Sequence, residues 1–315
     1  MLVDTEGGAV RGSHSPGACR ACFWGIPYAA PPTGSRRWRP PDRADPWDGV
    51  RDGQADNFSK CLQLPDGGLF GVSPDGEAAE EVIFNWRRRH DEDCLFVNVQ
   101  TPRLPSSKNA SLLPVLVSIH GGSYLSGSGS GTNASELCAD DILYVSFNYR
   151  IGIFGALSLP ELMHESNTTG NYAIQDQRAA LRWTRDNIHL FGGDPRRITL
   201  SGESAGAMAV AAHLASPRSA PLFQQAIMMS GNDASLLLDE AYEAGERFAA
   251  QTTCPRGPKR LVCLRASDAW HLLNQQNSVY NGTMRALCVP QRHHRIRMGC
   301  LKHSVGSCLR QGAIL

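Results

Sequence analysis

Short apolar runs alternate with longer segments of helical period along the middle of the chain. Leu113–Ile119 is an apolar run of strand length that ends at a Gly-rich segment, and Ile142–Phe147 is a second such run. From Asn171 to Leu190 apolar residues recur at seven-residue spacing, and Gly192-Gly193 follows directly. This pattern is typical of a helix that ends at glycine. It predicts two buried strands followed by a helix.

A second strand–helix unit follows the first along the chain. Arg197–Leu200 predicts a short strand, Ala205–Ala215 a tightly packed helix of small residues, and Ala226–Met229 a further strand. Strands that alternate with helices predict an α/β fold, with a mostly parallel central sheet and helices on both faces. Residues 1–60 are rich in Gly, Pro, Arg and Trp and have little period. They predict irregular structure or a short hairpin over the core.

The segment Gly202-Glu203-Ser204-Ala205-Gly206 lies between a predicted strand and a predicted helix. Taken alone, it is also compatible with a Gly-rich packing turn. In this context, flanking glycines let strand and helix approach while the serine hydroxyl stays exposed on a strained turn. The following helix N-terminus adds N–H groups and a positive dipole where an oxyanion would form. The pattern therefore indicates a nucleophilic serine, Ser204.

A second Gly-rich segment, His120–Tyr124, follows a predicted strand upstream of Ser204. Alone it would be a turn. A Gly-rich loop at this place can direct consecutive backbone N–H groups toward a substrate carbonyl oxygen. The two segments in this order favour acyl transfer from an ester.

Further segments resemble the type-B carboxylesterase and cholinesterase family, which has the α/β-hydrolase fold. They are Phe23–Ala29, Glu92–Val99, Asn148–Gly152, and the segment from Gly170 through Asp176-Gln177-Arg178 to Pro195. The resemblance runs over about residues 3–270. It implies hydrolysis of a small-molecule carboxylic ester, without a cofactor or a metal ion.

The resemblance also implies roles for individual residues. Ser204 would form the acyl-enzyme, and the backbone N–H groups of Gly122, Ser123 and Ala205 would form the oxyanion hole. Many family members have glycine where Ser123 stands, and a backbone donor survives that change. Glu203 would be a buried acid beside the nucleophile, the alternative being an ordinary turn carboxylate.

Disulfides between Cys61 and Cys94, and between Cys254 and Cys263, are likewise implied by the resemblance. Cys19 and Cys22 have the spacing of a redox or zinc pair, but no second pair with ligand spacing accompanies them. The resemblance assigns no partner to six cysteines: Cys19, Cys22, Cys138, Cys288, Cys300 and Cys308.

Two ion pairs with a structural role follow from the resemblance: Arg37 with Glu92, and Arg150 with Asp176. Cholinesterases place a tryptophan in the first disulfide loop, where it stacks on a quaternary ammonium group. In this chain Phe84 stands at the aligned place and Trp86 lies two residues away. A general carboxylesterase therefore fits better than a choline-selective enzyme.

Composition and short motifs favour secretion. The 315 residues are 42% hydrophobic with a formal net charge of +1, which gives no general attraction to nucleic acid or membranes. No apolar stretch has the length of a membrane span, and no secretory signal opens the chain. Ten cysteines suit an oxidising compartment. Five Asn-x-Ser/Thr sequons predict a glycoprotein, at Asn57, Asn109, Asn133, Asn167 and Asn281.

Residues 284–315 differ from residues 1–283, which we interpret as the N-terminal part of the esterase domain. The segment is basic, has three cysteines and contains no Asp or Glu. It would be a disordered surface tail, the product of a frameshift or intron read-through, or a nucleic-acid-binding segment.

The catalytic machinery is expected to be incomplete. In this fold the acid and the histidine of the triad follow the serine along the chain. The last acidic residue is Asp268, and the later histidines are expected to come too early to act: His271, His293, His294 and His303. The C-terminally truncated chain would then be inactive alone. The alternatives are a non-catalytic binding or adhesion protein on the same fold, or a short regulatory isoform.

Overall fold

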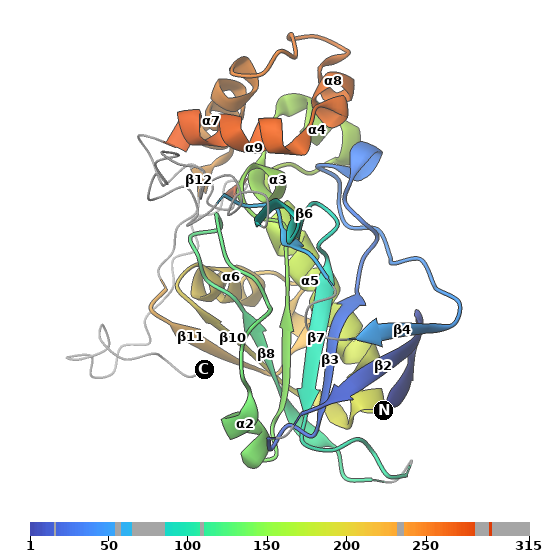
Figure 1. Cartoon of the computed structure of the whole chain (residues 1–315). Helices are drawn as coiled ribbons and strands as arrows, with labels where there is room; N and C mark the ends of the chain where they lie inside the picture. The colour runs from blue at the N-terminus through green and yellow to red at the C-terminus, as the bar shows by residue number, and fades with distance from the viewer. Residues whose placement is uncertain are drawn as a thin grey trace, which may run out of the picture.

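The computed structural model describes residues 1–15, 17–53, 58–64, 86–107, 110–231, 236–280 and 290–291 (Figure 1). Its centre is a nine-stranded sheet in the order β1-β2-β3-β7-β9-β8-β10-β11, with β4 beside β2. The strands are β1 (Leu2–Thr5), β2 (Gly8–His14), β3 (Ala21–Pro27), β4 (Val50–Gly53), β7 (Phe96–Thr101), β8 (Leu113–Ile119), β9 (Leu143–Phe147), β10 (Gly193–Glu203) and β11 (Gln225–Met229). Two-residue strands form two small separate pairs: β5 (Lys60–Cys61) with β6 (His90–Asp91), and β12 (Leu236–Leu237) with β13 (Pro290–Gln291).

The sheet is mixed. Strands β9, β8, β10 and β11 run parallel to one another, as the alternation of strands and helices predicts. The N-terminal strands pair differently, because the pairs β1–β2, β2–β3, β3–β7 and β7–β9 are antiparallel, while β4 runs parallel to β2. Residues 1–60 therefore contribute strands to the main sheet in addition to the expected hairpin. Their weak alternation gave no signal for β3.

Helices lie around the sheet and above one of its ends. α5 (Tyr172–Asn187) and α6 (Ala205–Leu214) match the predicted helices, and α5 continues into the 3-10 turn η3 (Ile188–Phe191). The helices α3 (Gly152–Ala156), α4 (Pro160–Ser166), α7 (Leu238–Ala250), α8 (Arg260–Ala266) and α9 (Ala269–Tyr280) gather above one end of the sheet in Figure 1. α2 (Ser135–Ala139) lies at the opposite end. Two further 3-10 turns are η1 (Gly34–Arg36) and η4 (Ala220–Leu222).

Two large apolar cores join the helices to the sheet and to one another. The first contains the inward side chains of the sheet together with α5 and α6, and every residue of β7 and β9 is buried. Strands buried on both faces read as continuous apolar runs, which is why the run at Ile142–Phe147 was visible in the sequence. The second core joins α3, α4, α7, α8 and α9 around Trp38 and Phe154, whose rings stack 6.4 Å apart. None of the helices in the described ranges combines the length and apolar character that a membrane crossing requires.

Candidate active site

Ser204 occupies a strained turn between β10 and α6. Its φ is +56° and its ψ is −121°, a combination that residues other than glycine rarely adopt. Such a conformation costs about 1–3 kcal/mol and persists only where the surroundings enforce it. The Ser204 N–H donates to the carbonyl of Met229, 2.9 Å away in β11, and the Ser204 carbonyl accepts from the N–H of Met208. The turn is thus held on both sides, with the serine half-buried.

The two glycines of the motif are required by close backbone approach. A Cβ on Gly202 would lie 2.3 Å from the carbonyl carbon and oxygen of Gly206, and a Cβ on Gly206 would lie 2.2 Å from the carbonyl oxygen of Ile119. These contacts join β10, α6 and the end of β8 within a few ångströms. They explain the sequence pattern, because any larger residue would push the helix away from the strand that carries Ser204.

The Gly-rich loop after β8 lies directly against this turn. A Cβ on Gly121 would be 3.3 Å from the Cβ of Ser204 and 2.8 Å from the carbonyl oxygen of Glu203. The loop then folds into a tight turn, because Gly122 has φ +101° and its carbonyl accepts from the N–H groups of Leu125 and Ser126. The two segments singled out in the sequence are therefore neighbours in space.

Three backbone N–H groups near Ser204 are available to a ligand. They belong to Gly122, Ser123 and Ala205, and no acceptor within the described ranges takes a hydrogen bond from any of them. Ala205 begins α6, so its N–H points out of the helix N-terminus and has no partner within the helix. Groups of this kind are suited to stabilise negative charge on an oxygen.

His120 helps to fix the Gly-rich loop. Its ring stacks on that of Tyr149 at 4.2 Å, and the Tyr149 hydroxyl donates to the His120 carbonyl at 2.7 Å. Burial lowers the pKa of His120 to about 4, so the ring is neutral at pH 7. Its Nδ1–H then donates to the carbonyl of Gly121, 2.8 Å away. The sequence did not single out Tyr149, whose motif suggested only family membership.

Gln63 ties the Gly-rich loop to the segment beside the first disulfide. Its Oε1 accepts from the N–H of Gly127 at 2.9 Å, and its Nε2 donates to the carbonyl oxygens of Gly127 and Cys61. The side chain is buried, so all three bonds are shielded from water. The sequence contains no signal for Gln63, because a lone glutamine near a cysteine belongs to no periodic pattern.

The candidate acid beside the nucleophile departs from expectation. Glu203 is exposed in this structure, so the expectation that it is buried is wrong here. Its carboxylate lies beside the Gly-rich loop, because a Cβ on Gly121 would be 3.2 Å from Glu203 Oε2, but the residue remains open to solvent.

No hydrogen bond joins a described histidine to Ser204. Those with hydrogen-bonded rings use other partners: His14 with Ser15, His90 with Trp86, His120 with Gly121, and His213 with Ser219 and Gln177. His271 is exposed near the start of α9. The other late histidines, His293, His294 and His303, lie outside the described residues. Within the described ranges, no group of three or more His, Cys, Asp or Glu side chains is arranged to hold a metal ion.

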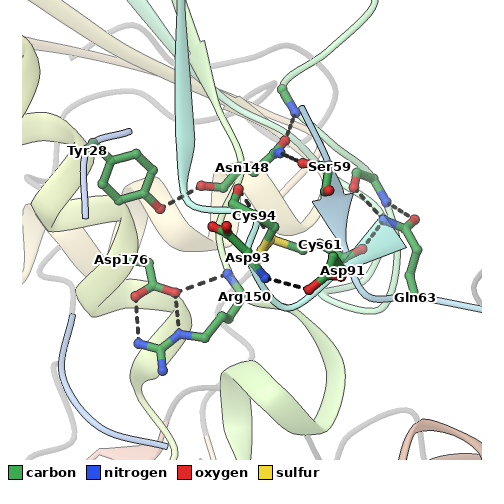
Figure 2. Close-up of a disulfide and its surroundings, with 12 residues drawn as sticks. Tyr28, Ser59, Cys61, Gln63, Asp91, Asp93, Cys94, Asn148, Arg150 and Asp176 are labelled. Atoms are coloured by element: carbon green, nitrogen blue, oxygen red, sulfur yellow. Dashed lines mark hydrogen bonds and ion pairs between the residues drawn. A yellow bond between two sulfur atoms is a disulfide. The ribbon is translucent and has the colours of Figure 1, made fainter. Parts of the chain in front are cut away.

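Figure 2 shows the disulfide Cys61–Cys94 and the polar groups around it. Cys254–Cys263 is also present, as the resemblance implies, and a third disulfide joins Cys19 to Cys138. Because Cys19 is bonded to Cys138, it does not form a redox or zinc pair with Cys22, and Cys22 is left as a buried thiol. Cys19 and Cys138 are 119 residues apart, and neither the motifs nor the period joins them. Cys288, Cys300 and Cys308 lie outside the described residues.

Both expected ion pairs are present. Arg150 binds Asp176 through two side-chain hydrogen bonds of 2.7 Å, and Arg37 binds Glu92 at 2.5 and 2.7 Å. Trp86 is half-buried, stacks on His90 at 4.1 Å and donates to the carbonyl of Gln63 at 3.0 Å. Phe84 lies outside the described residues, as do the sequons at Asn57, Asn109 and Asn281, whereas Asn133 and Asn167 are exposed.

Comparison with known proteins identifies the family. A family model described as the carboxylesterase family matches residues 1–294. The chain belongs to the carboxylesterase family. The match continues past residue 283, where we placed the domain boundary from the sequence. The α/β-hydrolase fold predicted from the sequence is confirmed by solved esterase structures.

Relatives and solved structures agree with this membership. The chain is 36% identical to acetylcholinesterase of Electrophorus electricus and 37% identical to acetylcholinesterase of Danio rerio, with 92% and 88% of this chain covered. It resembles a PNB esterase and the carboxylesterase of Geobacillus stearothermophilus, each with a TM-score of 0.75 over 90% of the chain, at 35% and 33% identity. It covers 46% and 43% of the two acetylcholinesterases, and 54% and 55% of the two solved chains. The chain therefore spans about half the length of the curated relatives it matches.

Proposed function

We propose that this chain carries the nucleophile and the oxyanion hole of a serine carboxylic ester hydrolase. The observation that carries the proposal is the strained φ of Ser204 on a turn that touches the Gly-rich loop. The Ser204 hydroxyl attacks the ester carbonyl and forms an acyl-enzyme as the alcohol leaves. The N–H groups of Gly122, Ser123 and Ala205 hold the oxyanion of the tetrahedral intermediate, and water then releases the acid.

The described residues do not provide the general base that this reaction needs. A serine hydroxyl is a weak nucleophile until a neighbouring histidine takes its proton. In the described part of the chain, no histidine forms a hydrogen bond with Ser204. Loss of the base from a triad lowers the rate on the order of a million-fold. We therefore expect the 315-residue chain to lack turnover by itself.

Added imidazole tests the nucleophile separately from the missing base. Purified chain and a Ser204→Ala variant are incubated with p-nitrophenyl acetate, with and without imidazole. Without imidazole, both proteins should release nitrophenol at the same rate. With imidazole, an acetyl adduct should appear on Ser204 in peptide mass spectra.

Two results would contradict this proposal in different ways. Turnover above the Ser204→Ala control without imidazole would mean that the chain already contains a base. Absence of any adduct, from a chain with the folded circular dichroism spectrum, would remove the nucleophile role of Ser204. It would favour a non-catalytic binding protein on the same fold.

We further propose that the chain folds in an oxidising, secretory compartment. Three disulfides lie among the described residues, and disulfides are rare in reducing compartments. The sequon residues Asn133 and Asn167 are exposed, as glycosylation requires. Mass spectrometry of the secreted chain under non-reducing conditions tests this. Recovery of free thiols at Cys61 and Cys94 would contradict it.

A further inference from the structure

A cavity of about 730 Å³ lies beside α2 and is separate from the residues around Ser204. Its wall combines hydroxyl and amide side chains, such as Ser130 and Gln100, with the aromatic rings of Trp24 and Phe58, and it also includes the cations Lys60 and Arg89. Hydroxyls and amides both donate and accept hydrogen bonds, and Trp24 offers a broad apolar ring that is only half-buried. This mixture suits a sugar, whose ring has an apolar CH face and a rim of hydroxyl groups.

The wall of this cavity is held in place by contacts from distant segments. Gln100 in β7 donates from Nε2 to the carbonyl of Thr132 at 2.8 Å, and its Oε1 accepts from the N–H of Ala134 at 3.3 Å. The disulfide Cys19–Cys138 joins α2 to the segment before β3. These contacts fix the loop at Thr132 and the position of α2, which both border the cavity.

Asn133 stands on the rim of the cavity, in the sequon Asn133-Ala134-Ser135. Its Oδ1 accepts from the Ser135 N–H at 3.0 Å and from the Ser135 hydroxyl at 2.6 Å, which fixes the side-chain amide at the start of α2. Its Nδ2 donates to no acceptor in the described ranges. The residue is exposed, so the nitrogen that would carry a glycan is both free and oriented.

We propose that Asn133 carries an N-linked glycan whose first sugar residues lie in this cavity against Trp24. In the modification, Nδ2 forms a bond to the anomeric carbon of an oligosaccharide donated by a lipid diphosphate. The lipid diphosphate leaves with the bonding electrons, and the amide loses one proton to solvent. The proposal is independent of Ser204 chemistry and needs only passage through the secretory compartment.

The sequon at Asn167 provides an internal control. Asn167 follows α4 in the left-handed conformation, with φ +53°, and is exposed. It does not line the cavity beside α2. A glycan on Asn167 should therefore project into solvent, whereas the glycan on Asn133 is partly covered by protein.

Enzymatic removal of glycans from the folded protein distinguishes these two situations. The full chain is secreted from a mammalian cell line by means of an added leader, treated with peptide N-glycosidase without denaturant, and analysed by peptide mass spectrometry. The Asn133 glycan should be released about two- to tenfold more slowly than the Asn167 glycan, the range that one aromatic contact provides. Trp24→Ala should remove the difference by accelerating release at Asn133 only.

Cys22 supplies a second measurement that leaves the aromatic wall intact. This thiol lines the cavity but is only 5% exposed, so a maleimide should modify it slowly, and a seated glycan should slow the reaction further. Ser135→Ala, which destroys the sequon, should raise the rate of Cys22 modification, while Ser135→Thr, which keeps it, should not. An unmodified Asn133 beside a modified Asn167, equal release at both sites, or an unchanged Cys22 rate in Ser135→Ala would each overturn the proposal.

Discussion

The turn at Ser204 and the region around the Cys61–Cys94 disulfide are stabilised in opposite ways. At the turn, backbone contacts backbone, because Gly202 and Gly206 leave no side chain between β10, α6 and β8. Around the disulfide, charged and polar side chains join segments far apart in the sequence, as Arg150 and Asp176 do in Figure 2. We therefore expect added side-chain atoms to destabilise the turn, and removal of a side-chain partner to destabilise the disulfide region.

The largest effect is expected from Arg150→Leu. The side chains of Arg150 and Asp176 are 3% and 0% exposed, so the substitution leaves a carboxylate buried without its partner. Breaking such a pair costs about 3–5 kcal/mol in the free energy of unfolding, which urea denaturation measures. Arg150 also donates to the carbonyl of Arg39 at 2.9 Å, which adds to the loss.

The double variant Arg150→Leu/Asp176→Leu tests the cause of that loss. Replacing both members of a buried pair by apolar side chains removes the unpaired charge, so the double variant should be more stable than Arg150→Leu alone. Arg185→Leu is the matched surface control, because Arg185 and Asp186 are 40% and 41% exposed. A double variant no more stable than the single one would show that Arg150 acts through packing instead of charge.

Removal of the Cys61–Cys94 disulfide should have the next largest effect. The cysteines are 33 residues apart, and the loop-entropy relation gives about 3–4 kcal/mol for replacing both by alanine. Cys254 and Cys263 are only 9 residues apart, so the same change there should cost about 2–3 kcal/mol. Urea unfolding of both double variants tests the ranking. Equal losses would indicate that native contacts, not restriction of the unfolded chain, set the effect.

At the turn, Gly206→Ala tests the effect of one added methyl group. Inside a helix, this change normally stabilises by about 0.5–1 kcal/mol. Here the new Cβ would lie 2.2 Å from the carbonyl oxygen of Ile119, so we expect a loss of about 2–3 kcal/mol instead. The sign of the change in the free energy of unfolding, measured with urea, therefore distinguishes a steric clash from an ordinary helix substitution. A stabilised variant would show that β8 and α6 separate freely at this point.

The same contrast explains what the sequence predicted. The strand, turn and helix around Ser204 lie within about twenty residues, and their period and glycines reveal them directly. The Gly-rich loop was placed beside Ser204 by its order along the chain, and its contact with the turn agrees. The Cys61–Cys94 pairing and the two ion pairs were inferred by resemblance alone, because no local pattern links residues so far apart.

Other features were indicated neither by a local sequence pattern nor by the family resemblance. Cys19–Cys138 and the bonds of Gln63 depend on how β3, β7 and the loops after β8 pack together. Apart from a hairpin, the N-terminal strands had no signal, since the apolar positions of β3 and β4 do not alternate over a run of sufficient length. The exposure of Glu203 depends on what covers the end of β10, which residues 202–206 do not specify.

The smallest effect on stability is expected from the ion pairs of Glu165, which lie near the surface. Glu165 binds Arg265 at 2.6 Å and Arg39 at 2.8 Å, and its side chain is 28% exposed. Hydrogen bonds from Arg265 and then Arg39 lower the pKa of Glu165 from 4.5 to about 2. Solvent screens these pairs, so Glu165→Gln should lower the free energy of unfolding by only about 1 kcal/mol at neutral pH.

The pH dependence of this loss has a definite sign. Because the pKa of Glu165 is lower in the folded protein, its contribution is fully present above about 4.5 and disappears as the pH falls toward 2. The difference between the parent chain and Glu165→Gln, measured by urea unfolding, should therefore shrink from pH 7 to about pH 3. Glu243→Gln, at the exposed pair with Arg247, should give no measurable difference at any pH. A difference in the free energy of unfolding that stays constant with pH would contradict this explanation. It would mean that the glutamine side chain fits the site poorly, because an effect of the lost charge must change as Glu165 titrates.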